Sequence, residues 1–294
     1  MRGEGLGLFK LKKHKNSVDD KVKRIQDERK YLLSHNQNFF LAEAYKTLRT
    51  NVLFSLTGES SCKVISVTSS FQGEGKSTTS ANLALSFVAA DKKVLLVDCD
   101  LRRPKLARLL DLNAPCGLSN VLIEPGLLEH ALLDYENTGL KVLLSGDIPP
   151  NPSELLGSER MAKLLLRLRE QFDYIILDTP PVNVVTDAVT LSGRTDGILF
   201  VVRAMKTVRG EVLHAIDQLE YAKAKVLGFV LNGVGQETSA YGGKRYGYYG
   251  HYGYRRSRRY GYGYGYGYGY GYGYGYGYAA RPQSEQKRDE ETKN

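Results

Sequence analysis

Cysteine and histidine are scarce in this 294-residue sequence, and tryptophan is absent. The three cysteines form no Cys-x-x-Cys pair and the five histidines form no cluster, which argues against a disulfide framework and against a zinc site. No apolar run approaches the roughly 18 residues of a membrane-spanning helix, and the first residues include no apolar stretch of signal-peptide length. We therefore expect a soluble cytoplasmic protein.

The excess of positive charge is confined to the two ends of the chain. Residues 1–30 contain 10 lysines and arginines against 5 acidic residues, and residues 241–294 contain 10 against 4. The residues between these ends contain 21 basic and 23 acidic side chains. This distribution is typical of basic arms attached to a neutral domain, rather than of a domain with a basic surface.

The middle of the chain alternates apolar runs of strand length with helical patterns. Such a pattern is typical of a parallel sheet with helices on both faces, so the expected fold is α/β and P-loop NTPase-like. The expected domain spans residues 39–240, between a basic flexible arm at 1–38 and a disordered tyrosine- and glycine-rich tail at 241–294. The expected strands are 63–69, 93–98, 141–146, 174–178, 197–202 and 226–231, and the main expected helices are 39–56, 77–90, 153–172 and 207–224.

The loop after the first expected strand has the sequence of a phosphate-binding loop. Residues 70–77 read Ser-Phe-Gln-Gly-Glu-Gly-Lys-Ser, which is the P-loop pattern with Ser70 in place of its first glycine. In such a loop, backbone N–H groups hold phosphates, Lys76 contacts the outer phosphates and Ser77 gives its hydroxyl to Mg²⁺. The alternative is a glycine-rich strand-to-helix turn without a ligand. The nucleotide-binding residues expected here are Gly73, Glu74, Gly75, Lys76, Ser77 and Thr78.

Three aspartates lie at the ends of two further strands. Asp98 ends one expected strand and is followed by Asp100, and Asp178 ends another. Because the carboxyl ends of parallel strands share one edge of the sheet, we expect all three carboxylates to converge on the P-loop phosphates. The alternative is that Asp98 and Asp178 only organise the loops that follow their strands.

Together these motifs resemble those of the bacterial tyrosine kinases of capsule and exopolysaccharide biosynthesis. Within that family, the sequence resembles the form in which the cytoplasmic kinase and its membrane activator are separate chains. The likeness covers residues 39–278. The matching segments are the loop Gly73–Ser77, the Asp98-x-Asp100-x-Arg102 motif, the Asp178-Thr-Pro-Pro motif, the run from Ser145 to Glu154 and a C-terminal cluster of tyrosines.

The resemblance implies a role for each matching residue. Lys76 would contact the outer phosphates of ATP, and Ser77, Asp100 and Asp178 would hold Mg²⁺ directly or through water. Asp98 would accept the proton of the incoming tyrosine. Phosphoryl transfer depends on positioning and charge neutralisation, which this set of residues supplies. Asn232, after the last expected strand, would contact the nucleotide base or simply shape a turn.

The helix at 39–56 includes a second set of charged residues, Glu43, Lys46 and Arg49. Their spacing spreads them over about 120° of the helix surface, largely away from the apolar stripe. The family that the sequence resembles uses a Glu-x-x-Arg-x-x-Arg motif here to build a ring of subunits. Lys46 departs from that motif, since it keeps the charge but lacks the two-pronged guanidinium. The alternative is a solvated helix face with an ordinary Glu–Lys pair.

Partitioning and septum-positioning ATPases are relatives of this family with another function. Their P-loop has a second lysine five residues before the invariant one, where this sequence has Phe71. This difference favours the kinase, and a membrane-recruited ATPase switch is the alternative.

The C-terminal tail is dominated by tyrosine and glycine, and from Tyr260 to Tyr278 ten tyrosines alternate strictly with glycine. The hypothesis is a cluster of phosphoacceptors in a disordered segment. An aromatic, basic nucleic-acid-binding arm and an inert spacer are the alternatives. The expected phosphoacceptors are Tyr246, Tyr248, Tyr249, Tyr252, Tyr254, Tyr260, Tyr262, Tyr264, Tyr266, Tyr268, Tyr270, Tyr272, Tyr274, Tyr276 and Tyr278.

The resemblance also implies partners and a location. We expect an ATP- and Mg²⁺-dependent kinase that forms a homo-oligomeric ring, binds a membrane-embedded activator or polysaccharide co-polymerase chain, and takes other proteins as further substrates. Nucleic acid is not an expected partner. The kinase would lie in the cytoplasm, at the inner face of the cell membrane, through its activator. The basic arm would assist that docking or remain a solvated flexible segment.

Overall fold

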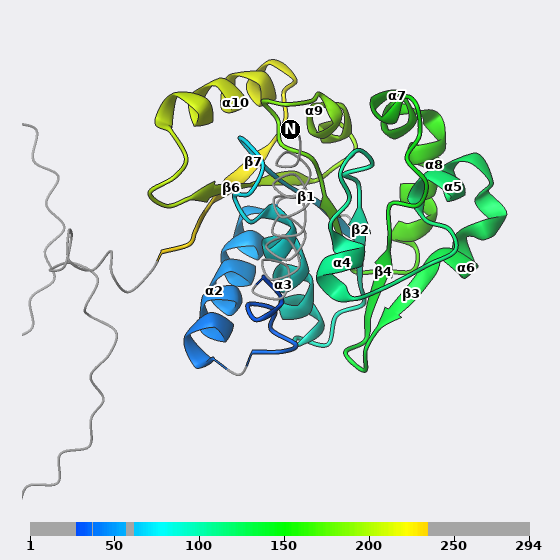
Figure 1. Cartoon of the computed structure of the whole chain (residues 1–294), viewed down its shortest axis with the longest axis horizontal. Coiled ribbons are helices and arrows are strands. Elements are labelled where there is room, and N and C mark those ends of the chain that lie inside the picture. Colours follow the sequence, from blue (N-terminus) through cyan, green and yellow to red (C-terminus); the bar gives the residue numbers. More distant parts are fainter. Residues whose placement is uncertain (1–27, 37, 57–61, 235–294) are drawn as a thin grey trace, which may run out of the picture. The chain divides into compact units, whose positions relative to one another are not determined.

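The computed structural model describes residues 28–36, 38–56 and 62–234 (Figure 1). In this part of the chain a single sheet contains seven strands, in the order β3-β4-β2-β5-β1-β6-β7. All six strands expected from the sequence are present, although the one expected at 141–146 ends at Leu143. The strands are β1 Lys63–Ser69, β2 Val94–Asp98, β3 Leu132–Tyr135, β4 Leu140–Leu143, β5 Tyr174–Asp178, β6 Gly197–Arg203 and β7 Val226–Asn232.

The sequence did not indicate the edge strand β3. It has four residues, directly follows the short helix α6 (Leu128–Ala131), and pairs antiparallel with β4, with Leu132 opposite Leu143. The other strand pairs are parallel. An antiparallel edge on a largely parallel sheet is common, so the α/β class is unchanged.

Helices cover both faces of the sheet, as expected (Figure 1). The alternation of side chains along each strand produces this arrangement, because successive residues point to opposite faces. Ile65 and Ile176 belong to the core beneath α2, α3 and α4, whereas Val64 and Ile175 belong to the core beneath α5, α7 and α8. These and the remaining helices are α2 Phe39–Ser55, α3 Lys76–Val88, α4 Leu106–Leu110, α5 Leu118–Ile123, α7 Pro152–Gly157, α8 Glu159–Arg169, α9 Asp187–Ser192 and α10 Arg209–Tyr221, with a 3-10 turn at Pro125–Leu127.

One expected helix is two helices in the structure. The segment 153–172 was predicted as continuous, but α7 ends at Gly157 and α8 begins at Glu159. Ser158 separates them in an extended conformation, and its hydroxyl accepts a hydrogen bond from the N–H of Met161. A serine in this position is a typical N-cap, and it starts a new helix in a new direction.

Residues 28–36 lie in the arm expected from the sequence, yet the structure packs them on the domain. Leu32 is fully buried in the core beneath α3. The side chain of Asn82, on α3, donates to the carbonyl of Tyr31 (2.7 Å) and accepts from the N–H of Leu33 (2.8 Å). The described chain therefore passes over α3 before it enters α2.

We expect Asn82→Ala to lower the free energy of unfolding by about 2 kcal/mol, because it leaves the partly buried backbone carbonyl of Tyr31 and N–H of Leu33 without their partner. Chemical denaturation measures the change. Asn113→Ala, at an exposed loop position, is the matched control and should leave the transition in place. Equal midpoints for the two variants would show that the two hydrogen bonds of Asn82 to this segment add nothing to stability.

No helix among the described residues is long and apolar enough to cross a membrane.

Candidate active site

The loop between β1 and α3 wraps around the amino end of α3. Gly73 and Gly75 have φ angles of +81° and +96°, in the left-handed region that glycine adopts without strain. A Cβ atom on Gly75 would lie 1.8 Å from Nδ2 of Asn232, so no larger residue fits. Lys76 and Ser77 then open α3, and the first N–H groups of a helix have no acceptor within it. This is the geometry of a phosphate-binding loop.

Side chains from β6, β7 and the loop itself hold this loop in place. The Asn232 amide donates to the carbonyl of Glu74 (2.9 Å), and Arg203 donates to the carbonyl of Gly73 (2.8 Å). The buried carboxylate of Glu74 accepts from the N–H of Phe71 (3.1 Å) and from the hydroxyl of Thr207. Asn232 thus supports the loop, and its predicted contact with a nucleotide base stays a prediction.

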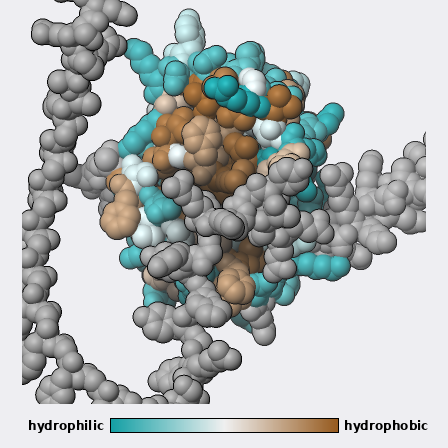
Figure 2. Space-filling model, turned by 90° about the vertical axis from the view of Figure 1, so that its left-hand side faces the viewer, coloured by the Kyte–Doolittle hydropathy of each residue, from teal (hydrophilic) through white to brown (hydrophobic). Residues whose placement is uncertain are grey.

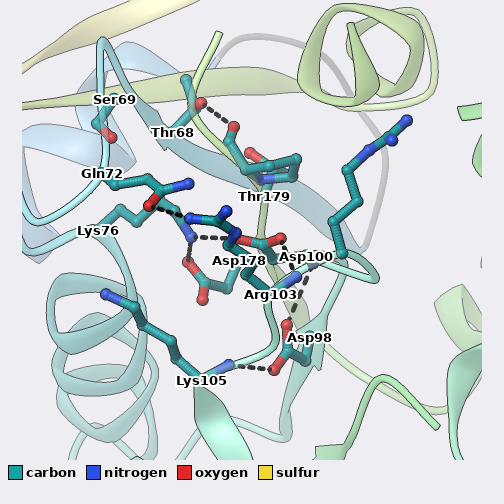
Figure 3. A network of polar contacts seen from close by, with 12 residues as sticks. Thr68, Ser69, Gln72, Lys76, Asp98, Asp100, Arg103, Lys105, Asp178 and Thr179 are labelled. Atoms are coloured by element: carbon teal, nitrogen blue, oxygen red, sulfur yellow. Dashed lines mark hydrogen bonds and ion pairs between the residues drawn. The ribbon is translucent and has the colours of Figure 1, made fainter. Parts of the chain in front are cut away.

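The aspartates expected at the edge of the sheet lie beside the loop lysine. The ammonium of Lys76 is 3.1 Å from Oδ2 of Asp100 and 3.7 Å from Oδ1 of Asp178 (Figure 3). Neighbouring strands bring them there, because β2 and β5 are paired with Asp98 opposite Asp178, and β5 also pairs with β1. Burial lowers the pKa of Lys76, but the charges of Asp178, Asp100 and Asp98 outweigh it and leave the pKa raised. Lys76 is therefore charged.

Asp98 is fully buried and organises the loop that follows β2. Its carboxylate accepts hydrogen bonds from the backbone N–H groups of Asp100 (3.1 Å), Lys105 (3.2 Å) and Leu106 (3.1 Å). Burial, together with the charge of Asp178, raises the pKa of Asp98 to about 7. Burial also raises the pKa of Asp178, against the opposing effect of Lys76. A carboxylate with a pKa near 7 suits proton transfer at neutral pH, and the role of Asp98 as base stays a prediction.

The oxygen atoms around Ser77 fit a magnesium ion that also binds phosphate. Among the described residues, the hydroxyl of Ser77 and Oδ2 of Asp178 are buried without a hydrogen-bond partner. Hydroxyl and carboxylate oxygens are ligands that Mg²⁺ prefers, and it is usually bound by one or two carboxylates plus substrate phosphates and water.

A cavity of about 460 Å³ extends from the loop toward α2. One end is formed by the loop and the start of α3, from Gly73 to Thr78. The other end is lined by Tyr31, Leu41, Tyr45 and Val234. The volume lies within the usual range of about 300–1,000 Å³ for small-molecule sites. A phosphate-binding end beside an aromatic end suits a nucleotide.

The sequence did not indicate the aromatic end of this cavity. Tyr45 repeats with the apolar stripe of α2, and Tyr31 lies in the segment expected to be a flexible arm. The sequence could have indicated Arg203 as a residue of the site, because it ends β6 at the same edge of the sheet as the aspartates.

The charged residues of α2 are only partly arranged as expected. Glu43 and Lys46 form an ion pair of 2.7 Å, which matches the alternative of an ordinary pair. Arg49 does not face away from the core, because its guanidinium donates to the carbonyl of Ser86 on α3 of the same chain. A role of the three residues in a ring of subunits stays a prediction. The tyrosine cluster and residues 1–27 lie outside the described residues.

Comparison with known proteins identifies the family. A family model described as an AAA domain matches residues 62–227. Tyrosine-protein kinase YwqD of Bacillus subtilis (strain 168) is 40% identical over 209 residues, which cover 71% of this chain and 86% of that protein. Tyrosine-protein kinase CpsD of Streptococcus agalactiae is 37% identical over 218 residues, or 74% of this chain and 92% of the relative. The chain belongs to the bacterial tyrosine kinases.

Solved structures agree with this kinase family. The kinase domain of Escherichia coli tyrosine kinase ETK matches with a TM-score of 0.64 at 31% identity, over 76% of this chain and 80% of that one. The chimerical protein CapA2B2 matches with a TM-score of 0.65 at 37% identity, over 68% and 88% of the two chains. The predicted α/β fold and the resemblance to the tyrosine kinases are confirmed.

Proposed function

We propose that this kinase transfers the terminal phosphoryl group of ATP, with Mg²⁺, to tyrosines of its own C-terminal cluster. The observation that supports this most directly is the buried group of Lys76, Asp100 and Asp178 beside a P-loop. In this P-loop the buried hydroxyl of Ser77 has no hydrogen-bond partner among the described residues. The same chain supplies an unusual density of acceptors, since 16 of its 21 tyrosines lie between Tyr241 and Tyr278.

The side chains of the site have separate roles in phosphoryl transfer. The amino end of α3 and Lys76 bind the outer phosphates, where charge accumulates during transfer. Ser77 and Asp178, with Asp100 nearby, would hold Mg²⁺, which supplies further neutralisation of the phosphate charge when it is bound. The attacking tyrosine oxygen forms a bond to the terminal phosphorus, the bond from that phosphorus to ADP breaks, and Asp98 takes the phenolic proton.

The position of β7 supports the tail as acceptor. β7 runs parallel to β6 and ends at Asn232, which touches the P-loop, so the described chain ends at the site with Val234 lining the cavity. Tyr248 lies 13 positions after Gly235. A chain of that length spans at most about 45 Å, enough for a tyrosine to meet the site of its own or a neighbouring subunit.

The test is autophosphorylation with ATP and Mg²⁺, read with an antiphosphotyrosine antibody. We expect replacement of the 16 tail tyrosines, Tyr241 to Tyr278, by phenylalanine to abolish the signal. Tyr221→Phe, at a highly exposed tyrosine of the domain, should leave it unchanged. Full labelling of the tail variant would place the acceptors elsewhere in the chain. Release of phosphate without any protein labelling would favour the ATPase switch.

The cellular setting is part of the same proposal. The kinase regulates capsule or exopolysaccharide synthesis and export, in the cytoplasm at the inner membrane face, through a membrane-embedded activator chain and within a homo-oligomer. Support for an oligomer comes from α2, where Phe40 and Phe54 are 80% and 83% exposed, and from β7, where Phe229 and Leu231 are more than half exposed. Figure 2 shows hydrophobic surface gathered on the side of the domain that lies left in Figure 1. Exposed apolar patches of this kind mark interaction sites.

A further inference from the structure

Arg103 is a charged residue beside the P-loop that the transfer described above does not use. It lies in the loop between β2 and α4, one residue after Arg102 of the aspartate motif. Its guanidinium Nη1 donates a hydrogen bond to Oε1 of Gln72 over 3.0 Å. Gln72 is an exposed residue of the P-loop, and Figure 3 shows the Arg103 side chain extending from its own loop toward Gln72 and Lys76.

The backbone beneath this side chain is fixed. The N–H of Arg103 donates to Oδ1 of Asp100 over 3.0 Å. The carboxylate of Asp98 accepts from the N–H groups of Lys105 and Leu106, just after Arg103. A fixed backbone with an exposed, flexible side chain lets the guanidinium change partner without any movement of the loop.

The two adjacent arginines of this loop differ in their partners. Arg102 is neutralised, because its guanidinium lies 3.0 Å from the carboxylate of the fully buried Asp187. Arg103 has only the neutral amide of Gln72, and no acidic side chain within the described chain forms an ion pair with it. Its positive charge is therefore available to an anion at the P-loop.

The charge balance of the site calls for such a cation. Lys76 lies among the three carboxylates of Asp98, Asp100 and Asp178, whereas Arg102, whose charge also acts on Asp100, is paired with Asp187. A triphosphate adds several negative charges. No second P-loop lysine is present to neutralise the terminal phosphate, because Phe71 occupies the position five residues before Lys76. An arginine suits this task because its planar guanidinium binds two phosphate oxygens at once.

We propose that Arg103 exchanges Gln72 for the non-bridging oxygens of the terminal phosphate and stabilises their charge during transfer. This inference rests on the proposed function. The terminal phosphorus breaks its bond to the bridging oxygen, whose electron pair stays with ADP, and forms its new bond to the tyrosine oxygen. The phenolic proton goes to Asp98, and Arg103 neither gains nor loses one. ADP lacks the terminal phosphate and therefore lacks this contact.

The test compares Arg103→Gln and Arg103→Lys with the wild type in full-length protein. We expect Arg103→Gln to lower the kcat of autophosphorylation about 100-fold, the usual loss for one donor to a charged transition state. Its preference for a non-hydrolysable ATP analogue over ADP should fall about tenfold, which corresponds to one charged contact. Arg103→Lys keeps the charge and should recover part of both losses. Arg108→Gln removes an equal charge from the exposed face of α4 and is the matched control.

Each outcome separates the inference from the function on which it rests. ADP affinity and the unfolding midpoint should be the same in Arg103→Gln and the wild type, which shows that the variant is folded. Equal kcat values in Arg103→Gln and Arg108→Gln would overturn the inference and leave the kinase intact. Equal losses of ADP and ATP-analogue affinity would also overturn it, because they indicate a purely structural role. A wild type that does not label itself would refute the proposed function, whereas the ratio of the two affinities would still decide whether Arg103 contacts the terminal phosphate.

Discussion

Lys76→Met should reduce tyrosine phosphorylation at least about 1,000-fold, the upper range for loss of one group that stabilises transition-state charge. Lys76 lines the phosphate-binding end of the cavity, and its ammonium is 3.1 Å from Asp100 and 3.7 Å from Asp178. Methionine fills a similar volume but brings no charge. Antiphosphotyrosine signal after incubation with ATP and Mg²⁺ measures the loss.

The same variant should be less stable, and more so at high pH. From the sequence alone, Lys76 looks like a solvent-accessible loop residue whose removal leaves the fold intact, but the structure buries it among carboxylates. Without it, the pKa values of Asp98 and Asp178 should rise further, because each loses the favourable charge of Lys76. The folded state then binds more protons than the unfolded state, so stability rises as the pH falls. Thermal denaturation between pH 5 and about pH 8 measures this slope.

Lys92→Met, at an exposed position after α3, is the control for both measurements. It should label normally and show the stability profile of the wild type. Labelling retained by Lys76→Met would contradict the kinase proposal. A pH profile of stability identical to that of the wild type would show that Lys76 does not compensate the carboxylates.

The convergence of the aspartates could be predicted because it follows from topology alone. Asp98 and Asp178 end neighbouring parallel strands, and the carboxyl ends of parallel strands meet at one edge beside the P-loop. The sequence therefore predicts which residues meet without any knowledge of their side-chain contacts. It predicts less well what they do there, because hydrogen-bond partners depend on the path of the following loop. The three backbone donors to Asp98 are an example.

Residues outside the strand pattern could not be placed from the sequence. Tyr31 and Leu32 precede the expected domain in a highly charged segment, and only the burial of Leu32 and tertiary contacts such as those with Asn82 show that this segment belongs to the fold. Arg49 has the spacing of a solvated helix face, but its long side chain reaches back to α3. Such contacts depend on tertiary packing, which neither periodicity nor local propensity encodes.

Asp98→Asn should lower kcat by about 100- to 10,000-fold, the usual range for loss of a general base. Since burial raises the pKa of Asp98 to about 7, the wild-type rate should increase from pH 6 to about pH 8 as the carboxylate ionises. The amide cannot take a proton, so the residual rate of the variant should not show this increase with pH, which is the acidic limb of the pH–rate profile. Asp217→Asn, at an exposed position of α10, is the control and should keep it.

The pH dependence of the free energy of unfolding gives an independent test of the raised pKa of Asp98. Its pKa is higher in the folded protein, about 7 against 3.8, so the folded state binds the extra proton between these values. Ionisation of Asp98 therefore lowers stability as the pH rises through this window, with no further loss from this group above about pH 7. Asp98→Asn should remove that part of the pH dependence, which denaturation curves across the window detect.

The two signatures together decide between proton transfer and loop support. The amide retains one accepting oxygen, but its NH₂ group would face the N–H groups that the carboxylate now accepts, so some loosening of the loop after β2 is expected. If Asp98 is the base, the Asp98→Asn variant should have a lower kcat, an affinity for ATP within about threefold of the wild type, and no increase of its rate between pH 6 and about pH 8. A parallel fall of ATP affinity and kcat, with the acidic limb retained, would instead make Asp98 a support of the loop that holds Asp100 and Arg103. The proton would then go to another carboxylate of the site, for which Asp100 at 3.1 Å from the Lys76 ammonium is the next candidate.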